Sequence, residues 1–331
     1  MTARENALRI IRFNRPERVL MAPPTHGIAY LGCNHEGFEG GGHHLAVGSH
    51  WVDIWGTTWV KEHDGVMGFP RGAPLADLVN GLRTYPWPDP DDPRLLRPLH
   101  EGCRGWTPAD AFLAGSHRDT IWEKSYMLVG MEELMCLLAT EREAVRELFH
   151  RVMDFQLGIA RHYLAAGVEM VSMTDDLGTQ DRLLLSRETI EDLLVPEYRR
   201  LFDLYRRHGV LVSFHSCGHV EPLLDLFIGL GVDILNPVQA SANDLRAVRE
   251  RTAGKMALQG SVRSGLLVSG PPEAIRGEAR RLMRELGAAG GYFCCPDQGM
   301  PWPAEHYQAL RETVEAEGVY PLPEAAPEEE A

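Results

Sequence analysis

The sequence lacks a long hydrophobic run, and this absence excludes one class of protein. No stretch of about 18 apolar residues, the length that predicts a membrane-spanning helix, occurs in the chain. The first residues, 1–6, show no basic start followed by an apolar segment, so we expect no secretory signal. These two absences predict a cytoplasmic protein that is not held in a membrane.

Positive charge is also scarce. The chain has 33 Lys and Arg residues against 47 Asp and Glu residues, a net charge of −14. A strongly acidic chain repels phosphate backbones and anionic lipids, so neither nucleic acid nor a membrane surface is the expected partner. Six cysteines in 331 residues do not make a disulfide framework. In a reducing compartment these cysteines are core residues, metal ligands or reactive thiols.

The second half of the chain contains a regular alternation of strand-like and helix-like segments. Five short apolar runs occupy residues 168–173, 210–214, 232–235, 255–260 and 292–296. Such alternation predicts a parallel sheet. Every run ends in polar or metal-binding side chains, whereas a doubly wound sheet gathers such groups only near its switch point. We therefore predict a (β/α)8 TIM-type barrel.

The barrel is expected to form one domain over residues 1–320, with an irregular N-terminal region. Val19–Ala22 is the expected first strand, and a long Gly- and His-rich loop follows it. Residues 321–331 consist mainly of Pro, Ala and Glu, which cannot bury a core. We predict that these last residues form a disordered acidic tail.

The pair His215 and Cys217 is the strongest candidate for a metal site. Zinc prefers imidazole and thiolate, and a catalytic zinc keeps three protein ligands and one open position. Residues two apart on an extended strand point to the same side, so both side chains can reach one ion. Cys294 and Cys295 end the last predicted strand and offer a third ligand across the barrel. The alternative is that all four are ordinary core residues.

Longer segments of the chain carry motifs that can be compared with known families. They are Asp175–Gln180, Pro196–Tyr198, Phe214–Val220, Gly231–Gln239 and Gly290–Tyr292, with a less specific one at Trp51–Gly56. Together they resemble the uroporphyrinogen decarboxylase superfamily, over roughly residues 50–315. The resemblance implies a (β/α)8 barrel and one of two activities. These are decarboxylation of porphyrinogens, and methyl transfer between a corrinoid cobalt and a thiol or related acceptor.

The two branches differ in the residues that they require. The resemblance to the methyltransferase branch implies a zinc held by His215, Cys217 and either Cys294 or Cys295, of which only one can face the barrel axis. The decarboxylase branch holds its carboxylate-rich substrate with arginines of the first loop. Residues 19–60 contain no Lys or Arg, so the bidentate donors that a polycarboxylate needs are missing there.

Other polar residues at strand ends are candidates for catalysis or substrate binding. Asp175 and Asp176 can position a substrate or act as a general base, and one of the two can instead cap a helix. Asn236, Gln239 and Gln259 are neutral hydrogen-bonding residues, which suits them to orienting a substrate.

The loop after the expected first strand is rich in histidine. Its members are His26, His35, His43, His44 and His50. This loop can act as a substrate-binding lid, hold an extra metal or simply be solvated, since the histidine spacing fits no closed zinc motif. His26 lies nearest a strand end, so it is the member that we expect to take part in catalysis.

These patterns lead to one main hypothesis. The chain is predicted to be a zinc-dependent methyltransferase that moves a methyl group between a corrinoid and a thiol or small methylated substrate. The corrinoid, a methylcobamide, is expected to reside on a partner carrier protein. The alternative activity is decarboxylation of a porphyrinogen or another carboxylated substrate, and a barrel that only binds metal or corrinoid is a third possibility. The protein is expected to be a monomer or homodimer.

Overall fold

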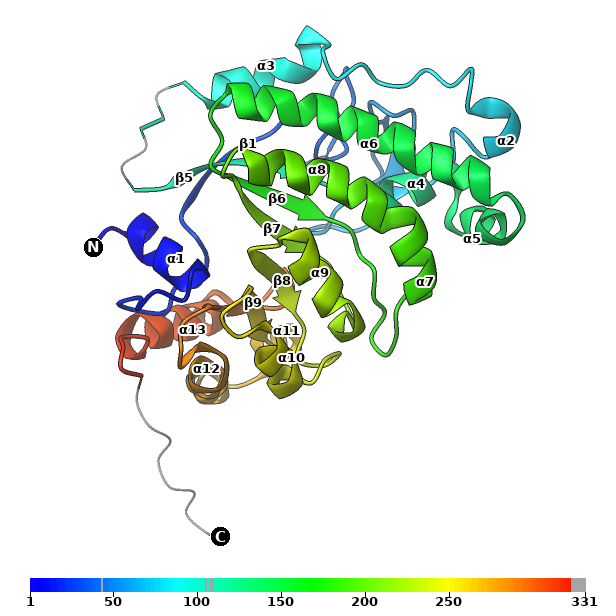
Figure 1. Ribbon diagram of the computed structural model, residues 1–331. Coiled ribbons are helices and arrows are strands. Elements are labelled where there is room, and N and C mark those ends of the chain that lie inside the picture. The colour runs from blue at the N-terminus through cyan, green and yellow to red at the C-terminus, as the bar shows by residue number, and fades with distance from the viewer. Residues whose placement is uncertain (43, 105, 108–109, 323–331) are drawn as a thin grey trace.

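A seven-stranded parallel sheet forms the centre of the computed structural model, which describes residues 1–42, 44–104, 106–107 and 110–322. The strand order is β1-β5-β6-β7-β8-β9-β10. Their bounds are Thr25–Ile28 (β1), Phe112–His117 (β5), Met170–Thr174 (β6), Leu211–His215 (β7), Ile234–Val238 (β8), Ala257–Val262 (β9) and Tyr292–Pro296 (β10). The sheet curls, and helices cover its outer side (Figure 1). From residue 323 on, the expected acidic tail lies outside the described residues.

Helices alternate with these strands along the chain. They are α1 (Ala3–Ile11), α2 (Leu78–Gly81), α3 (Pro93–Gly102), α4 (Trp122–Val129), α5 (Met131–Thr140), α6 (Arg142–Ala165), α7 (Arg187–Thr189), α8 (Val195–Arg207), α9 (Leu224–Leu230), α10 (Leu245–Thr252), α11 (Ser264–Ser269), α12 (Pro272–Gly287) and α13 (Ala304–Glu317), with a π-helical turn at Ile190–Leu194 and a 3-10 turn at Glu221–Leu223. Helix α6 packs on α8, and α12 packs on β9, β10 and α13. None of the described helices is long and apolar enough to cross a membrane.

The expectation of a complete eight-stranded barrel is met only in part. The segment Val19–Ala22 was expected to be the first strand, but it makes a single parallel bridge, from Leu20 to Phe293 of β10. The first regular strand is β1, which pairs with β5. Pro23 and Pro24 separate the two segments and have no N–H groups, so a continuous strand cannot form there. The fold is therefore a TIM-barrel-like curled sheet of seven strands.

All five strands expected in the second half of the chain are present as β6 to β10. Strand β5 was not predicted from the sequence, and neither was a small antiparallel sheet formed by β2 (His50–Val52), β3 (Thr58–Val60) and β4 (Phe69–Pro70). In this sheet Trp51 and Trp59 are buried and pack against Met127 of α4. The irregular N-terminal region thus contributes a structured wall beside α4.

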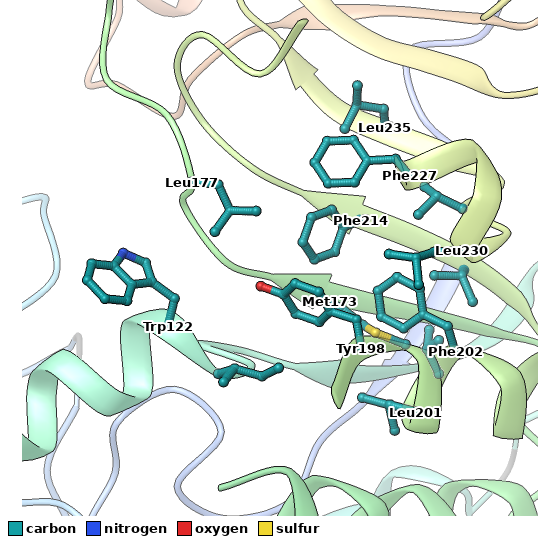
Figure 2. Packing of buried hydrophobic residues seen from close by; sticks show 14 of the residues in the cluster. Trp122, Met173, Leu177, Tyr198, Leu201, Phe202, Phe214, Phe227, Leu230 and Leu235 are labelled. Carbon is teal, nitrogen blue, oxygen red and sulfur yellow. The ribbon is translucent and has the colours of Figure 1, made fainter. Parts of the chain in front are cut away.

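Helices cover the outer face of the sheet and bury its side chains there, as is usual for parallel strands. On the outer face, Phe214 of β7 lies among Tyr198 and Phe202 of α8 and Phe227 of α9 (Figure 2). Each of these four rings is at most 2% exposed. Full burial of such a side chain contributes about 1.5–3 kcal/mol, so this cluster fixes β7 against its helices. It thereby fixes the end of β7, where His215 stands.

Candidate active site

A pocket of about 1040 Å³ opens where several strands of the curled sheet end. It takes residues that follow β5, β6, β7, β8 and β10, together with the segment Gly65–Pro70 that leads into β4. The polar or charged members of its lining include Asn34, Ser116, Arg118, Asp119, Glu123, Thr174, Asp176, Gln180, His215, Cys217, Gln239 and Gln298. Carboxyl ends of strands are where parallel barrels place their chemistry, so this pocket is the candidate active site.

His215, Cys217 and Asp176 form the one group of metal-binding side chains found among the described residues. Their ligand atoms lie within 4.8 Å of one another. His215 Nε2 is 3.1 Å from Cys217 Sγ and 3.6 Å from Asp176 Oδ1. One imidazole, one thiolate and one carboxylate are all ligands that zinc accepts, and the pocket leaves room for a further ligand. The donor set therefore fits a catalytic zinc.

Neighbouring residues orient this group. His215 Nδ1 lies 2.8 Å from Asn236 Oδ1, so its N–H donates to that oxygen and the Nε2 lone pair faces Cys217. The backbone N–H of Cys217 donates to Asp176 Oδ1 at 2.9 Å. Gln239 Oε1 accepts from the N–H of Gly218. Asn236 and Gln239 were expected to orient a substrate, and the structure places both against the His215–Cys217 segment itself.

Electrostatics also favour a cation at this position. Burial raises the pKa of the Cys217 thiol well above its usual range, and the Asp176 carboxylate raises it further. Without a counter-charge the thiol keeps its proton at neutral pH. A divalent cation bound here would reverse this preference, because it would stabilise both the thiolate and the neighbouring carboxylate.

The structure does not bring Cys294 or Cys295 into this group. Cys294 is fully buried in the outer hydrophobic core, whereas Cys295 points inward and hydrogen-bonds with Gln259. The last strand instead sends Gln298 to the site, and its Nε2 donates to Cys217 Sγ at 2.7 Å. The third member of the group is therefore Asp176, which follows β6, instead of a cysteine of the last strand. Gln259, expected to bind substrate, lies deeper in the barrel, outside the pocket.

Asp175 has a different role from its neighbour Asp176. Its carboxylate accepts hydrogen bonds from the backbone N–H groups of residues 121, 122 and 123, at 2.8–2.9 Å, and from the Tyr198 hydroxyl at 2.5 Å. It is fully buried and holds the start of α4. Because it is buried and four donors hold it there, it is not placed to act as a general base. The sequence allowed one of the two aspartates to cap a helix, and Asp175 is that one.

The Tyr198→Phe variant should lose about 1.5–3 kcal/mol of unfolding free energy, the usual contribution of a hydrogen bond to a charged acceptor. Burial raises the pKa of Asp175 to about 6, while Tyr198 is the strongest of the donors that lower it. When the pKa of a carboxyl is higher in the folded than in the unfolded state, the free energy of unfolding falls as the pH rises through the pKa of the folded state. Removing the donor raises the pKa further, so the loss should be larger at pH 8 than at pH 5.

Urea unfolding at both pH values measures this loss. Tyr163→Phe is the matched control, since Tyr163 is equally buried but donates to the neutral carbonyl of Ser116 at 2.8 Å. The control should lose about 0.5–1.5 kcal/mol. Equal, pH-independent losses in the two variants would contradict the role of Asp175.

A buried charged cluster forms another wall of the pocket, and the sequence reading missed it. Asp119 follows β5 with φ +53°, an unusual backbone conformation for this residue. Its carboxylate contacts His35 Nε2 and lies 3.4 Å from Lys124 Nζ. Burial opposes ionisation of Asp119, but His35 and Lys124 outweigh it and hold its pKa well below the usual range. The strand-end rule would have found Asp119 if β5 had been recognised.

Glu123 is a second pocket carboxyl that the sequence reading missed. Burial raises its pKa well above the usual range, and the neighbouring Asp119, Asp176 and Asp175 carboxylates add to the effect. Its Oε1 accepts a hydrogen bond from the Tyr126 hydroxyl at 3.3 Å. Burial and the neighbouring negative charges thus favour the protonated form of this side chain at the edge of the pocket.

The histidine-rich loop contributes a different residue from the one expected. His26 lies on β1 and its Nε2 bonds to the carbonyl of Gly102 at 2.7 Å, away from the pocket. His35 is the member that reaches the site, where its ring stacks on Trp59 at 4.0 Å and contacts Asp119. His43 lies outside the described residues. The described part of the loop holds no second metal-binding group.

Comparison with known proteins places this site in a family context. The family model described as "Uroporphyrinogen decarboxylase (URO-D)" matches residues 121–316, more than half of the chain. The uroporphyrinogen decarboxylase of Methylococcus capsulatus is 26% identical over 202 residues, which cover 57% of this chain and 55% of that protein. The chain thus matches about half the length of this relative.

A solved structure shares the fold over almost the whole chain. It is a methyltransferase from Methanosarcina mazei, with a TM-score of 0.69 and 16% sequence identity. The superposition covers 95% of this chain and 98% of the other. At this level of identity the likeness concerns the fold alone, and the chemistry has to be argued from the site.

Proposed function

The chain belongs to the uroporphyrinogen decarboxylase family, and from this membership we propose that it is a zinc-dependent methyltransferase. It would move a methyl group between a corrinoid, carried by a partner protein, and a thiol or small methylated substrate. The observation that carries the proposal is the convergence of His215, Cys217 and Asp176 in the strand-end pocket. A porphyrinogen decarboxylase would have no evident use for a sulfur–imidazole–carboxylate group.

In this proposal some residues of the site would bind the zinc ion and others orient these ligands. A zinc ion held by His215, Cys217 and Asp176 would supply the positive charge that lets a substrate thiol lose its proton at neutral pH. Asn236 fixes the His215 ring, and Gln298 holds the Cys217 sulfur. In such a transfer the substrate sulfur would form a bond to the methyl group as the cobalt–methyl bond broke, and both electrons of the broken bond would stay on the corrinoid.

The charges around the pocket support methyl transfer over decarboxylation of a polycarboxylate. Arg118 is the one Lys or Arg among the described residues that line it, and Asp119 lies 3.7 Å from the Arg118 Nε. Asp176 adds a negative charge at the metal-binding group. A substrate ringed with carboxylates would meet like charges here and find few bidentate donors.

Metal content and methyl transfer can be measured on one preparation. We expect one zinc per chain, and transfer of the methyl group of methylcobalamin to a simple thiol such as 2-mercaptoethanol, followed by the change in corrinoid absorbance. Chelation should abolish transfer and added zinc should restore it. An equal rate in metal-free protein would contradict the proposal. Release of carbon dioxide from a porphyrinogen would favour the decarboxylase alternative instead.

A further inference from the structure

The interior of the curled sheet is hollow directly beneath the metal-binding group. Thr174, His215 and Asn236 are in register across β6, β7 and β8 and form the row that faces the pocket. Two residues earlier on their strands, Ser172 and Ser213 are in register with each other. Ser116 of β5 extends this second row. Residues two apart on a strand face the same side, about 6.6 Å apart, so the serine row lies just below the site.

Small side chains leave a cavity at this level. The cavity measures about 330 Å³, and its lining includes Gly27, Ala114, Gly115, Ser116, Ser172 and Ser213. The interior of a parallel barrel is ordinarily filled by bulky branched residues. Here Ser172 is solvent-exposed in a central strand, although its neighbours Val171 and Met173 are fully buried.

The cavity adjoins the active-site pocket on one side and a hydrophobic cluster on the other. On the side away from the active site, Met170 lines the cavity and packs with Phe112, Leu211 and Ile10 of α1 in a separate hydrophobic cluster. Its upper side shares Ser116 with the active-site pocket. A ligand whose reacting end lies near His215 can therefore extend its other end into the cavity.

We infer that this cavity binds the non-reacting end of a small, uncharged, hydroxyl-bearing substrate, and we name it the serine compartment. None of the described residues that line it is Asp, Glu, His, Lys or Arg, so a charged group would find no ion partner there. Within the described chain, no protein group hydrogen-bonds to the hydroxyls of Ser172 and Ser213, which are left for water or a ligand. A purely apolar ligand would displace that water and leave the hydroxyls unpaired.

Size supports the same conclusion. Ligand pockets in proteins usually measure about 300–1,000 Å³, and the serine compartment lies at the lower end of this range. It suits a short chain with one or two hydroxyl groups. The inference rests on the proposed function only in assigning the reacting end of the ligand to the metal site.

Access to the compartment can be tested without any metal. The Ser172→Cys variant should react with the small neutral reagent methyl methanethiosulfonate. It should react at least about tenfold more slowly with the anionic sulfonatoethyl and the cationic trimethylammonioethyl forms, because each would carry an unpaired charge inside. Peptide mass mapping separates the new site from the native cysteines. Val171→Cys, which places the thiol on the buried outer face, is the control and should stay unlabelled. Equal labelling by all three reagents, or none by the neutral one, would overturn the inference.

The chemistry of the ligand is tested by calorimetric titration of the zinc-loaded protein with three thiols. 1-Thioglycerol should bind about tenfold more tightly than 1-propanethiol or 3-mercaptopropionate, since its hydroxyls can replace the displaced water. Ser172→Ala should reduce this preference several-fold and Ser172→Leu, which fills the compartment, should abolish it, both with unchanged zinc content. Equal affinities for the three thiols would overturn the inference. Failure of the proposed function has a separate signature, namely no zinc in the protein or no methyl transfer to any thiol.

Discussion

The Cys217→Ser variant should lose both its zinc and its methyl transfer activity. A serine hydroxyl is a far weaker zinc ligand than a thiolate, and Cys217 is the one cysteine among the described residues that groups with His215 and Asp176. Loss of an outer-shell partner of a metal site already costs about 10- to 100-fold in affinity or activity, so loss of a direct ligand should cost more than about 100-fold. Zinc content after dialysis and the transfer rate measure the two effects separately.

Cys294→Ser and Cys295→Ser are the matched controls, because each makes the same chemical change on the last strand. Both should keep one zinc per chain, since neither side chain belongs to the metal-binding group. Cys294→Ser should be less stable, because it puts a hydroxyl into a fully buried apolar site. Loss of zinc in Cys295→Ser alone, with zinc kept in Cys217→Ser, would show that the metal sits at another position.

The grouping of His215 with Cys217 could be predicted from the sequence, whereas the other members of the group could not, for a physical reason. The alternation of side chains along an extended strand predicted that His215 and Cys217 face the same side, which they do. It also predicted that only one of the adjacent cysteines faces inward, and Cys295 is that one. Alternation does not predict how far along the strand direction each side chain lies. The chain passes Cys295 below the site and reaches the level of Cys217 only at Gln298.

The fold could also be predicted from the sequence only in part. The strands β6 to β10 were predictable because each is an apolar run between helix-like segments. Strand β5, Phe112–His117, contains Gly115, Ser116 and the buried polar His117, so it does not read as an apolar run. With β5 unrecognised, the residues that follow it could not be assigned to a strand end. Asp119 was therefore missed, although the strand-end rule applies to it as well as to His215.

The buried cluster around Asp119 should be the most sensitive point of the pocket wall to loss of a charge. Lys124 and Asp119 are 2% and 3% exposed, and Lys124 Nζ also lies 5.5 Å above the Trp55 ring. The Lys124→Met variant removes the buried cation and leaves the carboxylate in place. Breaking a buried ion pair from one side ordinarily costs about 3–5 kcal/mol, a large share of a total stability of about 5–15 kcal/mol. Urea unfolding at pH 7 should show this loss.

The double variant Lys124→Met/Asp119→Asn shows whether the loss comes from the unpaired charge or from packing. With both charges removed, most of the lost stability should return, because no buried ion is left without a partner. Arg246→Met, which breaks an exposed pair with Glu250, should leave the unfolding midpoint unchanged. A double variant as unstable as Lys124→Met would mean that the methylene chain of the lysine, rather than its charge, supports the wall. If instead stability returns while methyl transfer stays low, the Asp119 carboxylate has a role in the pocket beyond balancing Lys124.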